Sequence, residues 1–237
     1  MKILFLSLFI SLFAIPAAAF TVRTTPTGEL VKWESDEIDV YLSPSLEVLG
    51  PSEEVYFGIV DAFETWIYEA EIDLQVNFIY GDCEAGYSAL SKNTNCIYAS
   101  LEPSSSNEDA GANASITYSQ VNGEIYDGDI AFYQGAGNWK FEDYDEGLDF
   151  KHVALHEIGH FLGLTHSQIS KAVMYPTVNL HTFQVSNLHE DDIYGALALY
   201  DTRKLDEQSA CQFAPTHRNP RSATAGNLLT LLLSLLF

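Results

Sequence analysis

The sequence has few basic residues. Only 11 of its 237 residues are Lys or Arg, against 33 Asp and Glu, which gives a formal net charge of −22. Nucleic-acid binding depends on Lys and Arg that neutralise phosphates, and anionic membrane surfaces also repel acidic chains. The composition therefore argues against a nucleic-acid partner, and against membrane attachment unless a hydrophobic segment anchors the chain.

Cysteine is also scarce, with three residues in all, and no repeat is visible. Hydrophobic residues make up 47% of the chain and charged residues 19%, which predicts one globular core rather than a disordered, coiled-coil or solenoid protein. Cys83 and Cys96 flank a polar loop and are the expected disulfide pair of an exported chain. This pairing leaves three alternatives for Cys211: it is free, it pairs with another molecule, or it is modified.

Both ends of the chain resemble processing signals. Met1-Lys2, an apolar run and Ala17-Ala18-Ala19 are typical of a secretory signal peptide, residues 1–19, cleaved after Ala19. A buried or membrane-spanning helix is the alternative, but the run is short for a span. Residues 227–237 are apolar and too few to span a bilayer. They are interpreted as a sorting or anchoring signal, with a helix docked on the core as the alternative.

Hydrophobic periodicity predicts one domain over residues 33–201, between an extension at 20–32 and a tether at 202–226. Alternation predicts strands at 38–42 and 72–78, and a short apolar stretch predicts one at 97–101. Asn122-Gly123 is a hairpin-turn signal and predicts strands at 114–120 and 125–133 on either side of it. Apolar residues at helical spacing predict helices from 52 to about 70, at 150–162 and at 188–200. Ser52 is the expected cap of the first helix, and Asn187 with Glu190 resembles a capping box for the last.

Three histidines have the spacing of ligands to one metal ion. His156 and His160 are four residues apart on a predicted helix, so their imidazoles project from one face. Gly163 permits a sharp exit from the helix, and the turned chain can bring back His166. Three neutral imidazoles leave one coordination position open, which is typical of a catalytic zinc site rather than a structural one.

Glu157 follows the first of these histidines and is placed to act as a general base. It would take a proton from a zinc-bound water and later give it to the leaving amine. The alternative, ordinary histidines brought together by chance, does not account for five residues at fixed offsets. The other histidines are interpreted as non-ligands: His152, His181, His189 and His217.

The run from His156 to His166 resembles the zinc signature of the metzincin proteases. Met174 lies where those enzymes have a methionine turn, and Ser167 is similar to the residue that follows the third histidine in matrixins, the matrix metalloproteinase group. The likeness extends from about Trp33 to Tyr200.

This resemblance implies an α+β metzincin fold, a twisted mixed five-stranded sheet with three helices. It implies a monomeric zinc endopeptidase whose extended protein or peptide substrate pairs with an edge strand, here 114–120. Met174 would form a hydrophobic floor under the zinc, or simply be a core methionine. Tyr175 and Pro176 would form the wall of the pocket for the residue after the scissile bond.

The sequence also departs from the matrixin pattern. No Pro-Arg-Cys-Gly-like propeptide motif precedes the domain, and no counterpart of the structural-zinc segment is found. Residues 127–132 are interpreted as a solvated acidic turn rather than a cation-binding strand. Residues 142–146 are interpreted as an exposed acidic loop, with calcium binding as the alternative. The resemblance further implies that the amine of a mature N-terminal Phe20 pairs with Asp191.

Two other functions remain open at this point. One is an inactive metzincin that binds proteins, although the ligands and Glu157 are all present. The other is a zinc amidase for small peptides or cell-wall fragments. An open cleft along the edge strand would favour the endopeptidase, whereas a capped cleft would favour small ligands. Export would place any of them outside the cell or at its surface.

Overall fold

The computed structural model describes residues 20–88, 94–101, 111–136, 138–141, 147–177 and 187–200. The predicted signal peptide, the acidic loop at 142–146, the tether and the apolar tail lie outside these residues. So do His181, Cys211 and His217. Among the described residues, no helix is long and apolar enough to cross a membrane.

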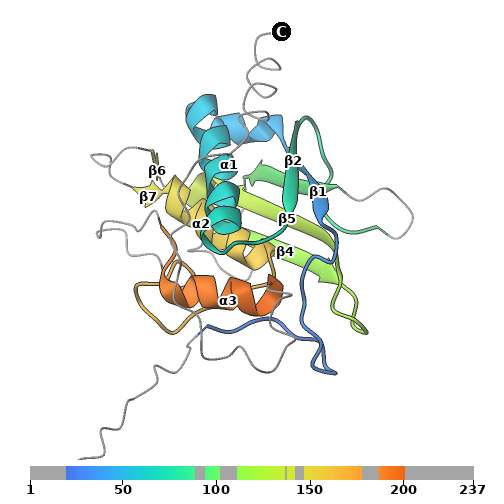
Figure 1. Cartoon of the computed structure of the whole chain (residues 1–237). Helices are drawn as coiled ribbons and strands as arrows, with labels where there is room; N and C mark the ends of the chain where they lie inside the picture. Colours follow the sequence, from blue (N-terminus) through green and yellow to red (C-terminus); the bar gives the residue numbers. More distant parts are fainter. Residues whose placement is uncertain are drawn as a thin grey trace, which may run out of the picture.

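A five-stranded sheet organises the described chain (Figure 1). Its strands are β1 (Glu37–Leu42), β2 (Gln75–Tyr80), β3 (Asn95–Ser100), β4 (Ala112–Tyr118) and β5 (Ile125–Tyr133), in the order β2-β1-β3-β5-β4. All neighbouring pairs are parallel except β4 and β5, which are antiparallel. The mixed sheet is confirmed, and β4 is the edge strand that was expected at 114–120.

Helices α1 (Ser52–Glu69) and α2 (Phe150–Phe161) pack on one face of the sheet, and α3 (Glu190–Tyr200) lies beyond α2 (Figure 1). We call the helix-covered face the inner face and the opposite one the outer face. Phe161 joins the layers, since its ring lies 5.4 Å from that of Phe63 and 5.1 Å from that of Trp33. Trp66 of α1 donates its indole N–H to the carbonyl of Leu155 at 2.8 Å, which fixes α2 just before His156.

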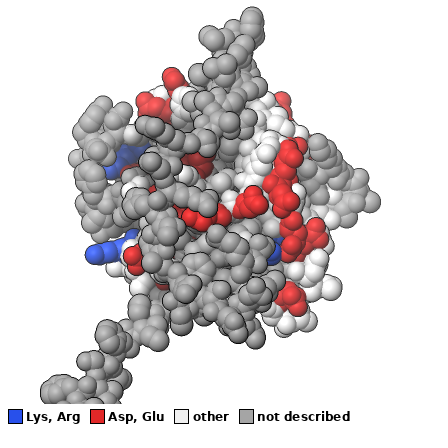
Figure 2. Space-filling view, in the orientation of Figure 1, with Lys and Arg blue, Asp and Glu red and all other residues white. Residues whose placement is uncertain are grey.

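Short elements complete the fold. They are the 3-10 turns η1 (Pro44–Val48) and η2 (Gln134–Ala136) and the paired strands β6 (Trp139–Lys140) and β7 (Leu148–Asp149). The last three lie in the stretch after β5 that was expected to be a loop. In Figure 2, the described part of the visible face carries several patches of Asp and Glu and few Lys or Arg, in line with the net charge.

Most element boundaries differ from the prediction by one or two residues, and three differences have a clear local cause. Ser52 is the first residue of α1 rather than its cap, because Pro51 occupies the cap position. α3 begins at Glu190, and the capping contact comes from Asp192, whose carboxylate accepts from the backbone N–H of His189 at 2.9 Å. β2 begins at Gln75 instead of residue 72, because the segment that leaves α1 turns before it pairs with β1.

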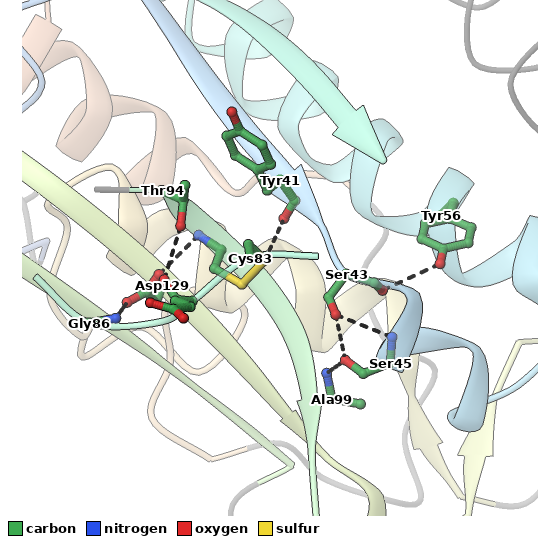
Figure 3. Close-up of a disulfide and its surroundings, with 11 residues drawn as sticks. Tyr41, Ser43, Ser45, Tyr56, Cys83, Gly86, Thr94, Ala99 and Asp129 are labelled. Atoms are coloured by element: carbon green, nitrogen blue, oxygen red, sulfur yellow. Dashed lines mark hydrogen bonds between the residues drawn. A yellow bond between two sulfur atoms is a disulfide. The ribbon is translucent and has the colours of Figure 1, made fainter. Parts of the chain in front are cut away.

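Residues 127–132 were wrongly interpreted as a solvated turn, because they lie within β5. A side chain at Gly128 would point at Phe161 on the inner face, so Asp127 and Asp129 point to the outer face. They are only 2% and 4% exposed. Asp129 accepts hydrogen bonds from the backbone N–H groups of Gly86 at 2.6 Å and Cys96 at 2.9 Å (Figure 3). Asp127 Oδ1 has no hydrogen-bond partner in the described structure.

Asp127 should make stability fall as pH rises. Burial and the nearby charge of Asp129 raise the pKa of Asp127 to about 6, against about 3.9 in an unfolded chain. The folded state therefore holds this proton more tightly, so the stabilisation is complete below about pH 4 and is lost as pH rises through about 6. We expect a loss of roughly 1–2 kcal/mol in the free energy of unfolding.

Denaturant titrations between pH 4 and pH 7 on the chain and on Asp127→Asn would measure this loss. The decline should be smaller in the variant by this amount, and the variant should be the more stable protein at pH 7. Equal pH dependence in both proteins would show that Asp127 titrates normally.

The predicted disulfide between Cys83 and Cys96 is present, with a Cα–Cα distance of 5.7 Å (Figure 3). It closes the segment whose N–H groups bind Asp129. Replacing both cysteines by Ser should lower the free energy of unfolding by about 2–4 kcal/mol, because the unfolded chain gains the entropy of an open loop. Chemical denaturation measures the loss. Cys211→Ser is the control and should leave stability unchanged, whereas equal stability of all three proteins would contradict the structural role of the bond.

Candidate metal centre

Three imidazoles converge at the C-terminal end of α2. His156, His160 and His166 each offer one nitrogen, and these nitrogens lie within 4.8 Å of one another. The Nε2 atoms of His160 and His166 are 3.2 Å apart. Within the described residues this is the one group of three or more metal-binding side chains. The structure therefore brings together the three histidines whose spacing predicted a shared metal ion.

Local backbone conformation explains the convergence. The carboxylate of Asp149 accepts from the backbone N–H of His152 at 3.1 Å and caps the start of α2. The helix ends at Phe161, and Gly163 follows with φ of +99°. A side chain at Gly163 would lie 2.2 Å from the carbonyl oxygen of Val31, so only glycine fits this turn. The turn reverses the chain and returns His166 to the helix.

Backbone carbonyls orient two of the rings. His156 Nδ1 lies 2.7 Å from the carbonyl oxygen of Val173, and His160 Nδ1 lies 2.9 Å from that of Leu164. Because a carbonyl oxygen can only accept, each Nδ1 must carry the proton. Each Nε2 then keeps its lone pair, which is the arrangement that metal-binding histidines commonly show.

The three rings are held in the neutral form that binds metals. Burial lowers the pKa of His156 to about 3, and the neighbouring His160 adds to this shift. Burial likewise lowers the pKa of His160 to about 4. The pKa of the more exposed His166 is also lowered by burial. At neutral pH no proton has to leave before these nitrogens accept a cation.

Glu157 lies beside the histidines and is only 7% exposed. Its Oε2 accepts a hydrogen bond of 2.7 Å from the backbone N–H of Ala114 in β4. Burial raises the pKa of this carboxyl to about 7, although the bond from Ala114 opposes the shift. The side chain thus joins α2 to the sheet edge and can exchange a proton near neutral pH.

Met174 packs beneath the helix that carries the histidines. It is 2% exposed, and a side chain at Gly159 would lie 2.3 Å from its sulfur atom. Gly159 is therefore required where Met174 meets α2. Tyr175 is half-buried and Pro176 is exposed, directly after Met174.

Two aspartates of α3 support the chain around the histidines. Asp192 accepts from the backbone N–H groups of Val173 at 2.8 Å and Met174 at 3.0 Å. Asp191 Oδ2 accepts from the hydroxyl of Ser167 at 2.5 Å, and its Oδ1 accepts from the backbone nitrogen of Phe20 at 3.0 Å. The backbone nitrogen of Phe20 thus lies beside Asp191, the residue that the resemblance makes the partner of a mature N-terminal amine.

Sequence reasoning missed several of these supports. Ala114 and Asp192 come from segments far from the histidines in the sequence, so the spacing of residues around the histidines does not predict them. The helix position of Gly159, next to a metal motif, was a usable signal of close packing. The two remaining described histidines lie outside the metal group, as predicted: His152 and His189.

Comparison with known proteins adds independent information. A family model described as Matrixin matches residues 32–201. Metalloendoproteinase 1 of Glycine max is 30% identical over 143 residues, which cover 60% of this chain and 44% of that protein. Matrix metalloproteinase-2 of Drosophila melanogaster is 41% identical over 88 residues, 31% of this chain and 12% of that protein. Metalloendoproteinase 4-MMP of Arabidopsis thaliana is 40% identical over 91 residues, which cover 36% of this chain and 24% of that protein. The matched part therefore spans less than half the length of these relatives.

Proposed function

Because the chain belongs to the matrixin family, we propose that it is a zinc-dependent endopeptidase that cleaves extended protein or peptide chains. His156, His160 and His166 are the proposed zinc ligands, and Glu157 is the proposed general base. The observation that carries this proposal is the convergence of three neutral imidazoles beside a buried carboxyl group at the edge of the sheet.

The donor set fits zinc. Three imidazole nitrogens are a common catalytic zinc set, and their Nδ1 bonds to backbone carbonyls leave the Nε2 atoms available. When bound, zinc supplies Lewis acidity that lowers the pKa of water and polarises a carbonyl group.

Glu157 carries the proton transfers. It accepts a proton from the attacking water, whose oxygen bonds to the scissile carbonyl carbon. It then gives the proton to the amine nitrogen as the carbon–nitrogen bond breaks. A carboxyl group with a pKa near neutrality suits both transfers, because it neither holds the proton too tightly nor releases it too readily.

The edge strand supports an extended substrate. Among the strands of the described chain, β4 pairs with β5 alone, so its other side can take an added strand. Ala114 marks that free side, because its N–H reaches Glu157 instead of β5. A substrate paired along β4 would therefore pass beside the general base. Tyr175 and Pro176 are proposed to wall the pocket for the residue that follows the scissile bond, and Met174 to form the floor.

Substrate length separates this function from a narrow amidase. The full chain would be incubated with a reduced, alkylated protein and with a series of peptides from three to twelve residues. An endopeptidase should cut internal bonds, and its kcat/KM should rise with length as more residues pair with β4. Mass spectrometry identifies the products. Cleavage confined to the smallest peptides would support the amidase, and zinc binding without cleavage would support the inactive binding protein.

Export is part of the proposal, with the protein secreted or retained at the cell surface through residues 227–237. The disulfide supports it, because such bonds persist in oxidising compartments. The proposed order along the chain is a signal peptide at 1–19, an extension at 20–32, a catalytic domain at 33–201 and a tether at 202–226. The protein is proposed to act as a monomer on protein or peptide substrates.

Signal-peptide cleavage after Ala19 would turn the backbone nitrogen of Phe20 into a charged amine. The segment that begins there already pairs with the turn before His166, because the N–H of Arg23 bonds to the carbonyl of Gly163 at 3.1 Å. A charged amine would strengthen the 3.0 Å contact with Asp191 into an ion pair.

The free energy of unfolding should therefore be about 1–3 kcal/mol higher for a chain that begins at Phe20 than for one that begins at Ala19. Its kcat should also be higher, because Asp191 also accepts from Ser167, the residue after His166. Denaturation and kinetics on the two matched chains measure both effects. Asp191→Asn is the control and should make the two chains equal. Equal stability and kcat without that substitution would discard the ion pair.

A further inference from the structure

A hollow of about 280 Å³ lies on the outer face of the sheet, over β3, β5 and β4. Ala131 of β5 is at its centre, paired with Tyr98 of β3 on one side and Asn113 of β4 on the other. Asp129 and Tyr133 line it two residues before and after Ala131 along β5. The hollow exists because the central side chain is a single methyl group surrounded by larger ones.

Asp129 places a negative charge in this hollow. Its carboxylate is 4% exposed and accepts two backbone hydrogen bonds (Figure 3). The ion pairs of the described chain involve other carboxylates, Glu34 and Asp61. A buried charge without a counter-charge is costly, and burial accordingly raises the pKa of Asp129. A cation in the hollow would offset that cost.

The remaining wall favours an organic cation over a metal ion. One carboxylate matches one positive charge, whereas calcium usually takes several carboxylate or carbonyl oxygens. Tyr98 and Tyr133 also line the hollow, and aromatic rings can attract an ammonium group. The hydroxyls of Ser100 and Ser115 and the amide oxygen of Asn113 can accept its N–H bonds. The volume is near the lower end for small-ligand sites, which suits a short alkyl chain.

We propose that this hollow binds a primary alkylammonium group, supplied by a lysine side chain or by a free alkylamine. The site is distinct from the metal centre, because it lies on the outer face while Glu157 meets β4 at its free edge. It adds a binding function that the peptidase reaction does not require.

Calorimetric or NMR titration of the full chain tests the proposal. The probes are Nα-acetyl-lysine methylamide, n-butylammonium and the uncharged Nα-acetyl-norleucine methylamide. The lysine derivative should bind saturably and the norleucine derivative should not. Binding of n-butylammonium as well would identify a site open to free amines, whereas its failure beside the lysine derivative would assign the site to lysine in a peptide.

Asp129→Asn should weaken amine binding by about tenfold or more, because the charge-assisted hydrogen bond is lost. Asp39→Asn is the matched control, since Asp39 is an exposed carboxylate of β1 outside the hollow, and it should change nothing. Ala131→Leu should abolish binding by filling the floor. Ser115→Leu should also abolish binding, because its larger side chain fills the hollow. Ser115 is exposed, so this variant still tests the proposal if Ala131→Leu does not fold.

Ala131→Leu should still cleave peptides, because Ala131 lies in β5 and touches neither the metal centre nor the free edge of β4. Equal binding of the norleucine derivative, or amine binding unchanged in Asp129→Asn, would overturn the proposal. Calcium binding in the hollow, with neither charged probe binding once calcium is removed, would also overturn it.

Discussion

Replacing Glu157 by Gln should lower kcat for peptide hydrolysis by about a hundred- to ten-thousandfold. The variant keeps the size of the side chain and an oxygen that can accept from Ala114 N–H, so the link between α2 and β4 should survive. What it loses is the ability to take a proton from water. Steady-state kinetics on an internally cleaved peptide would measure the loss.

The matched control is Glu64→Gln. Glu64 is a glutamate of α1 in which burial also raises the pKa of the carboxyl, but it lies outside the metal centre. It should retain wild-type kcat. Zinc content should be equal in all three proteins, because Glu157 is not a ligand. A fall in kcat of less than about tenfold in Glu157→Gln would assign the proton transfer to another group.

Replacing His166 by Ala should weaken zinc binding by at least about a hundredfold and reduce hydrolysis to background. Two imidazoles cannot hold the ion as three do, and His166 is the one ligand that follows the helix rather than lying within it. It is also exposed, so its removal should disturb the core less than removal of the buried His156. Competition with a chromophoric chelator would give the zinc affinity of each protein.

His189→Ala is the control for this series, because His189 lies outside the metal group at the start of α3. It should bind zinc with wild-type affinity. If His166→Ala held zinc as tightly as the wild type, the proposed ligand set would be wrong and another side chain would have to complete the site.

The metal centre was predictable because its signal is local. The four-residue spacing of His156 and His160 places them on one helix face, and Gly163 predicts the turn that brings His166 back to the helix. The edge position of β4 followed from the family resemblance. Sequence patterns located the five strands of the main sheet and all three α-helices, because most of them bury an apolar side in the core, but they missed the short pair β6 and β7.

The misses arose where distant segments decide the environment. Asp127 and Asp129 have the sequence pattern of a solvated turn, yet both are buried, and the disulfide-closed segment binds Asp129 through the N–H of Gly86. Asn187 had the spacing of a cap, but Asp192 takes that role while also binding the N–H groups of Val173 and Met174. In both cases a carboxylate accepts hydrogen bonds from backbone N–H groups in a distant segment, and residue spacing along the chain does not predict such pairs.

The central claim is that His156, His160 and His166 hold a zinc ion on which peptide hydrolysis depends. The most direct test is the metal content of the purified full chain, measured together with its cleavage of an unfolded protein before and after chelation. The account predicts one zinc per chain, loss of cleavage when the zinc is removed, and recovery when zinc is restored. A folded chain that binds no zinc, or one that cleaves equally well without it, would contradict the account.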